Sequence, residues 1–180
     1  MDDCIQFRRA VSGDAENYAH ILNQSWKDTY GEYVSIEHID EEFNIEKLIE
    51  NFEEYIKNKD MELYMIEYKD HIVGILELGT PEEDYKENMK GIGEWRTLHI
   101  KKEFHSLGIG TIAEQFACSR LKELGYKICC LWVKKQNEKA IRFHLKNRFK
   151  KTNYTCENPS DGAPSFIMEK VLEEELYENF

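Results

Sequence analysis

The chain has 180 residues, of which 41% are hydrophobic and 33% charged, and its formal net charge is −11. This length suits a single domain. No apolar run reaches the roughly 18 residues of a membrane-spanning helix, so we do not expect a membrane protein. The acidic balance disfavours nucleic acid as a partner. It favours cationic substrates, although acidity alone also keeps a protein soluble.

The N-terminus and the cysteines predict a cytoplasmic protein that binds no metal. The first ten residues, MDDCIQFRRA, lack the basic and then apolar pattern of a secretory signal. The five cysteines are odd in number, and no cysteine or histidine cluster has metal-ligand spacing. Cys129 and Cys130 lie inside the apolar run KICCLWV, where we expect reduced thiols in the core.

The first half of the chain predicts a strand, two helices and a hairpin. Residues 4–11 alternate as a strand does, and apolar residues from Ala15 to Trp26 have helical spacing, which indicates a helix to about Lys27. Asn44 is expected to cap a second helix that runs to Ile56. Two further strands are expected over 61–68 and 71–79. Only two residues separate them, so they should form an antiparallel hairpin, which a polar loop over 80–93 follows.

The second half predicts a β-α-β crossover followed by two strands. The expected elements are a strand over 94–100, a helix from Ile109 to about Gly125, a buried parallel strand over 127–133, a helix over 137–147, and strands over 149–155 and 166–172. The order is β-α-α-β-β-β-α-β-α-β-β. It predicts an α/β (α+β) fold with a mixed, mostly antiparallel central sheet of six to seven strands and about four helices.

We expect one domain over 1–180, with a core over about 4–172 and an acidic C-terminal tail over 173–180. Apolar residues in the last strands, such as Phe166 and Met168, are compatible with a homodimer.

The stretch HSLGIGT, residues 105–111, has three interpretations. Its glycines continue into Gly-x-Gly-x-x-Ala, which matches a dinucleotide fingerprint as a string. However, the glycines do not follow the first strand of a parallel sheet, and the required acid about 20 residues further on is missing. The glycines could instead only supply positive φ in a turn. In the third interpretation, backbone N–H groups and a helix N-terminus bind a pyrophosphate.

The surroundings of this stretch favour the third interpretation. LHIKKEFHSLGIGTIAEQF (98–116) resembles the acetyl-CoA loop of the GNAT N-acetyltransferase superfamily, and NEKAIRFHLKNRF (137–149) is similar to that family's second signature. The resemblance covers nearly the whole chain and implies a GNAT-like fold with acetyl-CoA as co-substrate. The sequence departs from the family pattern in four places: His105 replaces Gln or Arg, Lys102 replaces Pro, Arg148 replaces Gly and His144 replaces Tyr.

The resemblance also implies where the cofactor lies. It should lie between the strands 94–100 and 127–133, with backbone groups of 98–100 at the pantetheine arm and 105–111 at the pyrophosphate. The residues so implied are Leu98, His99, Ile100, His105, Ser106, Leu107, Gly108, Ile109, Gly110, Thr111 and Asn137.

Glu94 and His144 are the predicted catalytic residues. Glu94 resembles a family glutamate and would accept the amine proton through water; alternatively it pairs with a nearby Lys or Arg. His144 would serve the coenzyme A thiolate as acid or N–H donor; alternatively it is a surface histidine, and Tyr30 or Tyr33 donates instead. The resemblance implies that Trp26, Tyr30 and Tyr33 line the acceptor pocket, although the helical spacing of Trp26 also suits the core.

The sequence therefore predicts an acetyl-CoA-dependent N-acetyltransferase that acts on a small cationic amine. A protein or peptide amine is the alternative acceptor. A non-catalytic acetyl-CoA-binding module is the alternative class, and the histidine at position 144 is the feature that favours it.

Overall fold

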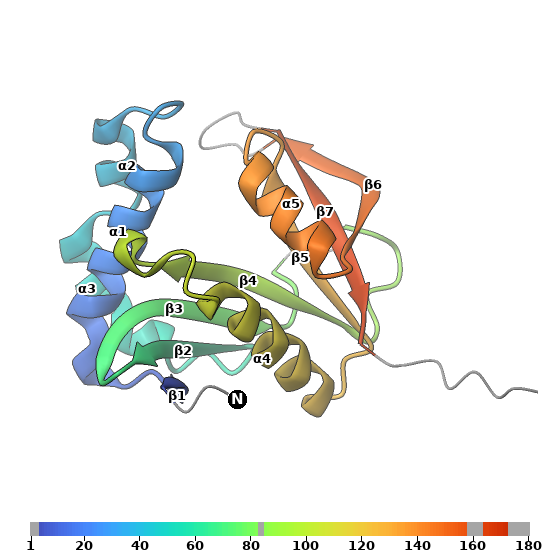
Figure 1. The fold of residues 1–180 in the computed structure, drawn as a ribbon, viewed down its shortest axis with the longest axis horizontal. Helices are drawn as coiled ribbons and strands as arrows, with labels where there is room; N and C mark the ends of the chain where they lie inside the picture. Colours follow the sequence, from blue (N-terminus) through green and yellow to red (C-terminus); the bar gives the residue numbers. More distant parts are fainter. Residues whose placement is uncertain (1–3, 83–84, 158–163, 173–180) are drawn as a thin grey trace, which may run out of the picture. The chain divides into compact units, whose positions relative to one another are not determined.

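The structure is a computed structural model that describes residues 4–82, 85–157 and 164–172. The described residues form seven strands in one sheet, in the order β1-β2-β3-β4-β5-β7-β6, and five α-helices (Figure 1). The strands are β1 (Ile5–Arg9), β2 (Met61–Tyr68), β3 (His71–Gly79), β4 (Ile92–Ile100), β5 (Ile128–Lys134), β6 (Lys150–Glu157) and β7 (Pro164–Val171). The helices are α1 (Ala15–Tyr30), α2 (Ile36–Glu42), α3 (Ile45–Tyr55), α4 (Ile109–Glu123) and α5 (Glu138–Lys146). The predicted mixed α/β fold is confirmed.

The chain divides into two compact units. The first unit contains residues 1–78 and 97–113, and the second contains 79–96 and 114–180. Strand β4 contributes to both units, since its residues 92–96 belong to the second and 97–100 to the first. The organisation as a single domain stays a prediction, and the predicted acidic tail over 173–180 lies outside the described residues.

The helices of the first unit differ from the prediction in one element. Helix α2 was not expected; the Ser35 side chain caps it by accepting from the N–H of His38, and its Ile39 is buried. Four of its seven residues are acidic, so the segment shows too little apolar periodicity to predict a helix. The predicted cap of α3 is confirmed, because the Asn44 side chain accepts from the N–H of Lys47.

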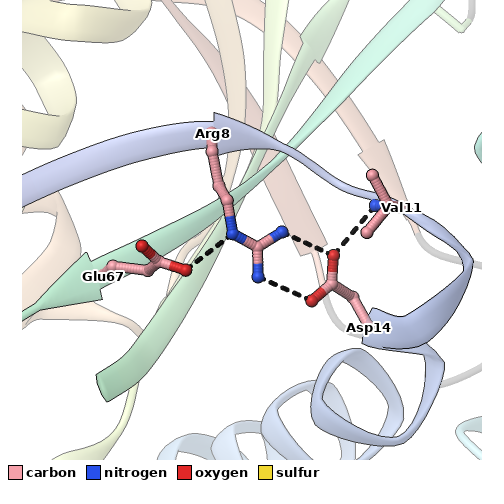
Figure 2. A network of polar contacts seen from close by, with 4 residues as sticks. All are labelled: Arg8, Val11, Asp14 and Glu67. Atoms are coloured by element: carbon pink, nitrogen blue, oxygen red, sulfur yellow. Dashed lines mark hydrogen bonds and ion pairs between the residues drawn. The ribbon is translucent and has the colours of Figure 1, made fainter. Parts of the chain in front are cut away.

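A partly buried ion-pair network joins β1 to the start of the first helical segment (Figure 2). The Arg8 guanidinium donates through both terminal nitrogens to the Asp14 carboxylate at 2.7 and 2.8 Å, and through Nε to Glu67 at 2.6 Å. The N–H of Val11 donates to the same Asp14 carboxylate. Burial alone would raise the pKa of Asp14, but the hydrogen bonds from Arg8 and Val11 outweigh it and lower that pKa.

We expect Arg8→Met to destabilise the protein by about 2 kcal/mol, because it leaves the buried Asp14 carboxylate with only its backbone donor. Chemical denaturation at pH 7 measures this loss. Arg142→Met is the matched control: it breaks the exposed pair with Glu138 and should change stability little. Equal losses in the two variants would contradict a buried role for Arg8.

The second unit places two carboxylates in one row of the sheet. Strand β4 pairs in parallel with β5 through Ile92, Gly93 and Glu94, and Glu94 lies opposite Cys130. Cys130 in turn opposes Glu169 in the antiparallel pair of β5 and β7. Directly opposed residues of neighbouring strands project to the same face of a sheet. Glu94, Cys130 and Glu169 therefore lie side by side on one face.

The apolar residues of β5 and β7 form the core of the second unit. Cys129 and Cys130 are buried free thiols, as expected from their apolar run. Phe166 and Met168 are also buried within the chain. These two residues therefore offer no apolar surface to a second copy, and they give no support to a homodimer. At the other side of β7, the pairing with β6 has a register irregularity between Lys151 and Thr155.

Candidate functional site

The predicted pyrophosphate loop is a tight turn that leads into α4. A short 3₁₀ helix over Lys102–Phe104 ends where the N–H of His105 donates to the carbonyl of Lys102. The His105 imidazole contacts the Ile100 carbonyl through Nε2 at 2.8 Å. Positive φ angles follow at Ser106 (65°) and Gly108 (81°), which reverse the chain before the helix. The N–H that we expected His105 to offer a ligand is therefore used within the turn.

The residues after His105 leave backbone donors available at the head of α4. The first N–H groups bonded in this region are those of Thr111 and Ile112, which both donate to the Gly108 carbonyl. In the described part of the chain, the N–H groups over 106–110 have no hydrogen-bond partner. A Cβ added to Gly108 would meet no atom within 4 Å, so the loop borders open space. Unpaired N–H groups at a helix N-terminus suit an anion.

The end of β4 is held close to its neighbours in the first unit. A Cβ on Gly74 would lie 2.5 Å from the His99 carbonyl, so only glycine allows the observed approach of the two strands. The Nδ1 atom of His99 lies 2.8 Å from the hydroxyl of Ser25 in α1. Burial lowers the pKa of His99 to about 4. A neutral imidazole thus links the predicted cofactor strand to the predicted acceptor-side segment, a contact that the sequence did not reveal.

The predicted acceptor residues lie at the end of α1 and just beyond it. Trp26 stacks on Phe43 at 4.4 Å between ring centroids and also packs against Tyr30 at 4.7 Å. Trp26 belongs to the apolar cluster of the first unit, which agrees with a core role. Tyr33 is 66% exposed, so its side chain is accessible to a ligand. Their part in acceptor binding stays a prediction.

A polar cavity of about 500 Å³ also lies in the first unit. Residues of α1 and the segment just after β4 line it, among them Ser25, Asp28 and Ile100.

Glu94 is buried and has contacts that favour its charged form. Its Oε2 accepts from the N–H of Glu82 at 2.9 Å and lies 3.5 Å from Nε of Arg96. Arg96 also donates to the Thr80 carbonyl. The ion pair weighed as an alternative is thus present. Both contacts stabilise the carboxylate form, which is the form that accepts a proton.

His144 lies in an aromatic cluster of the second unit. Its ring has edge contacts with Trp95, Phe143 and Phe149 at centroid distances of 5.2 to 5.5 Å. Burial lowers the pKa of His144 to about 4, so the imidazole is neutral at pH 7. Its Nδ1 is buried and has no hydrogen-bond partner in the described part of the chain. The residue is therefore not the surface histidine that the amphipathic helix also allowed.

The two partly buried histidines, His99 and His144, predict a loss of stability in mild acid. The pKa of each is about 4 in the folded chain and near 6.5 when unfolded. The unfolded chain therefore binds more protons below pH 6.5, and stability falls as the pH drops toward 4. Between pH 7.5 and 5, we expect each histidine to lower the free energy of unfolding by about 2 kcal/mol.

Urea unfolding at the two pH values measures this loss, and His144→Phe should reduce it. The control is His71→Asn, since His71 is exposed. A pH dependence that is the same in wild type and His144→Phe would contradict the buried, neutral state of His144.

The segment between β3 and β4 is anchored at several described positions. Tyr85 donates its hydroxyl to Oε1 of Glu169 at 2.6 Å, and the Lys86 ammonium lies 2.6 Å from the same oxygen. Tyr85 also packs edge-on against Trp132 and Tyr154. The sequence analysis missed Glu169, because only the strand register brings this residue beside the loop.

The second signature begins with a helix cap. The Asn137 side chain caps α5 by accepting from the N–H of Ala140, and its contact with a pantetheine arm stays a prediction. A second cavity, of about 920 Å³, lies in the second unit and is lined by α4, the end of α5, and parts of β6 and β7. Across the described residues, no group of three His, Cys, Asp or Glu side chains is arranged to hold a metal ion.

Comparison with known proteins identifies the family. The chain matches the model described as "Acetyltransferase (GNAT) family" over residues 19–149, and it belongs to that family. It is thus an N-acetyltransferase that uses acetyl-CoA as co-substrate. Within the part that the structure describes, no helix has the length and apolar character needed to cross a membrane.

Three known proteins are similar to this chain over nearly their whole length. A spermidine N(1)-acetyltransferase of Thermoplasma acidophilum is 29% identical over 174 residues, which cover 94% of this chain and 98% of that protein. The PaiA N-acetyltransferase of T. acidophilum, solved in complex with coenzyme A, has a TM-score of 0.71 at 26% identity and covers 93% of this chain and 98% of its own. The dodecameric spermidine N-acetyltransferase of Vibrio cholerae has a TM-score of 0.72 at 16% identity, with 99% and 100% covered, and is similar in fold.

Proposed function

We propose that this enzyme acetylates a small cationic amine of the polyamine type. The observation that carries the proposal is the row of unpartnered N–H groups over 106–110 at the head of α4, which suits the pyrophosphate of acetyl-CoA. The named activity of the T. acidophilum relative supports a polyamine as acceptor. The net charge of −11 also favours a cationic substrate.

The cofactor residues act through their backbone. The N–H groups over 106–110 hold the pyrophosphate, and those near Leu98–Ile100 bond the pantetheine arm and polarise the acetyl carbonyl. The N–H of His105 contributes less than we expected, because it already donates to Lys102. When bound, acetyl-CoA supplies an activated thioester.

In this proposal, Glu94 accepts a proton and His144 donates a hydrogen bond. An alkylamine has a pKa near 10.4, so it reaches neutral pH almost wholly protonated and must lose a proton before it attacks. Glu94 accepts this proton through water. His144 is neutral, so it can serve the departing sulfur only by donating an N–H bond. Its buried Nδ1 without a partner is a costly arrangement that a ligand atom would relieve.

Thiol release in the presence of an amine panel tests the proposed function. The panel contains spermidine, a diamine, a lysine-containing peptide and a peptide with a free N-terminus. We expect turnover with the polyamine and diamine and much slower turnover with the peptides. Faster turnover with a peptide would favour the protein-amine alternative, and acetyl-CoA binding without any turnover would favour the non-catalytic module.

The proposal also covers the cellular location and the oligomeric state of the enzyme. We place it in the cytoplasm, because all five cysteines are free thiols and reducing compartments keep thiols in this state. We also propose a homodimer, although the buried apolar residues of β7 do not support one. Light scattering during size-exclusion chromatography measures the oligomeric state directly.

A further inference from the structure

The Lys86 side chain occupies a site with the chemistry of ammonium recognition. Its Nζ lies 2.6 Å from Oε1 of Glu169 and 5.2 Å from the centroid of the Tyr85 ring. The Tyr85 hydroxyl donates to the same carboxylate oxygen. Trp132 and Tyr154 pack against the Tyr85 ring and fix its position. A carboxylate beside an aromatic face is a favourable environment for an alkylammonium ion.

This ammonium site lies in the same row of the sheet as the predicted base. Glu94, Cys130 and Glu169 oppose one another across β4, β5 and β7. The two glutamates are thus separated by two strand spacings, roughly 10 Å between Cα atoms. Burial raises the pKa of Cys130 to about 12, and the negative charges of both glutamates add to this effect, as expected if both approach the thiol. Two anionic groups on one face at this separation suit a ligand with two positive charges.

We propose that Glu169 and Tyr85 bind the second ammonium group of a diamine or polyamine while its first amine reacts beside Glu94, and that Lys86 fills this subsite when no acceptor is bound. The inference rests on the proposed function and deepens it, because it names the residues that select acceptors with two charges. Lys86 is then an internal competitor of the substrate.

The pair is only partly buried, which allows such an exchange. The Lys86 and Glu169 side chains are 22% and 24% exposed, so solvent reaches both. A carboxylate that is mostly buried needs a cationic partner, and either ammonium can supply it. When a substrate ammonium replaces the lysine ammonium, one such pair is exchanged for another. The position of the Tyr85 ring does not depend on the lysine, since Tyr85 keeps its contacts with Trp132, Tyr154 and Glu169.

Steady-state kinetics with 1,4-diaminobutane and with butylamine test the subsite, because these acceptors differ only by the second amine. We expect Glu169→Gln to raise KM for the diamine about tenfold, the loss of one charge-assisted contact, and to change KM for butylamine less than twofold. Lys86→Met should lower KM for the diamine and leave kcat unchanged. The matched controls Glu87→Gln and Lys90→Met alter exposed residues of the same loop and should leave both values unchanged.

Two results would overturn the subsite: an equal effect of Glu169→Gln on both acceptors, or a higher diamine KM in Lys86→Met. Should Glu169→Gln fail to fold, Tyr85→Phe replaces it, since the ring stays and only the hydroxyl bond to Glu169 is lost.

Calorimetric titration of 1,4-diaminobutane separates the subsite from the proposed function, because it needs no turnover. If no amine is acetylated at all, the proposed function fails. The subsite then stands if Lys86→Met binds the diamine more tightly than wild type, and it fails if the two bind equally.

Discussion

Glu94→Gln is expected to lower kcat/KM for the amine acceptor about 100-fold at pH 7, the usual contribution of a positioned general base. Without the base, the rate follows the fraction of free amine, which rises about tenfold per pH unit until the pH nears 10.4. The deficit should therefore shrink to below about tenfold by pH 9.5. A profile of kcat/KM from pH 6 to 10 measures both effects.

The glutamine side chain retains an oxygen that can accept from the N–H of Glu82, so the local fold should survive. Equal thermal unfolding midpoints of the variant and wild type establish this. A constant deficit at every pH, or no deficit, would remove Glu94 as the base. Arg96→Lys serves as a comparison, since it keeps the positive charge beside Glu94 and should preserve the shape of the profile.

Gly108→Val is expected to raise KM for acetyl-CoA about 50-fold, which corresponds to the loss of a charged hydrogen bond or two at the pyrophosphate. Gly108 has a φ of 81°, which a β-branched side chain does not adopt without strain, and no atom lies within 4 Å of its Cβ position in the loop predicted to bind the pyrophosphate. KM for the amine should change little. Initial rates at varied acetyl-CoA concentration measure the effect.

Gly125→Val is the matched control, because Gly125 has a φ of 90°, an equally open surrounding and a place just beyond the other end of α4. Both variants should lose similar stability, but only the change at Gly108 should affect acetyl-CoA binding. A similar rise of KM for acetyl-CoA in both variants would show that backbone strain explains the result, and not the loss of a pyrophosphate-binding loop.

Local signals in the sequence predicted most elements of the fold. Asn44 caps its helix as predicted, and Lys69 with Asp70 reverses the chain of the predicted hairpin through two positive φ angles. These features depend on a few neighbouring residues. Helix α2 was missed because its seven residues show too little apolar periodicity.

The candidate site was less predictable, because long-range packing defines it. The sequence of α5 is compatible with a surface histidine, and only the approach of Trp95 and Phe149 buries the His144 ring. The partnership of Glu169 with Tyr85 depends on the register of β5 with β7, across 84 residues of chain. No pattern in the sequence sets that register in advance.

The strand order leaves β1 and β6 at the two edges of the sheet. An edge strand carries unpaired backbone groups onto which a strand from another molecule can grow. Strand β6 begins with Lys150 and Lys151 and then loses regular pairing before Thr155, and both lysine charge and an irregular backbone oppose such growth. Strand β1 is only five residues long and carries Arg8 and Arg9. Both edges thereby oppose pairing with an edge strand of another copy.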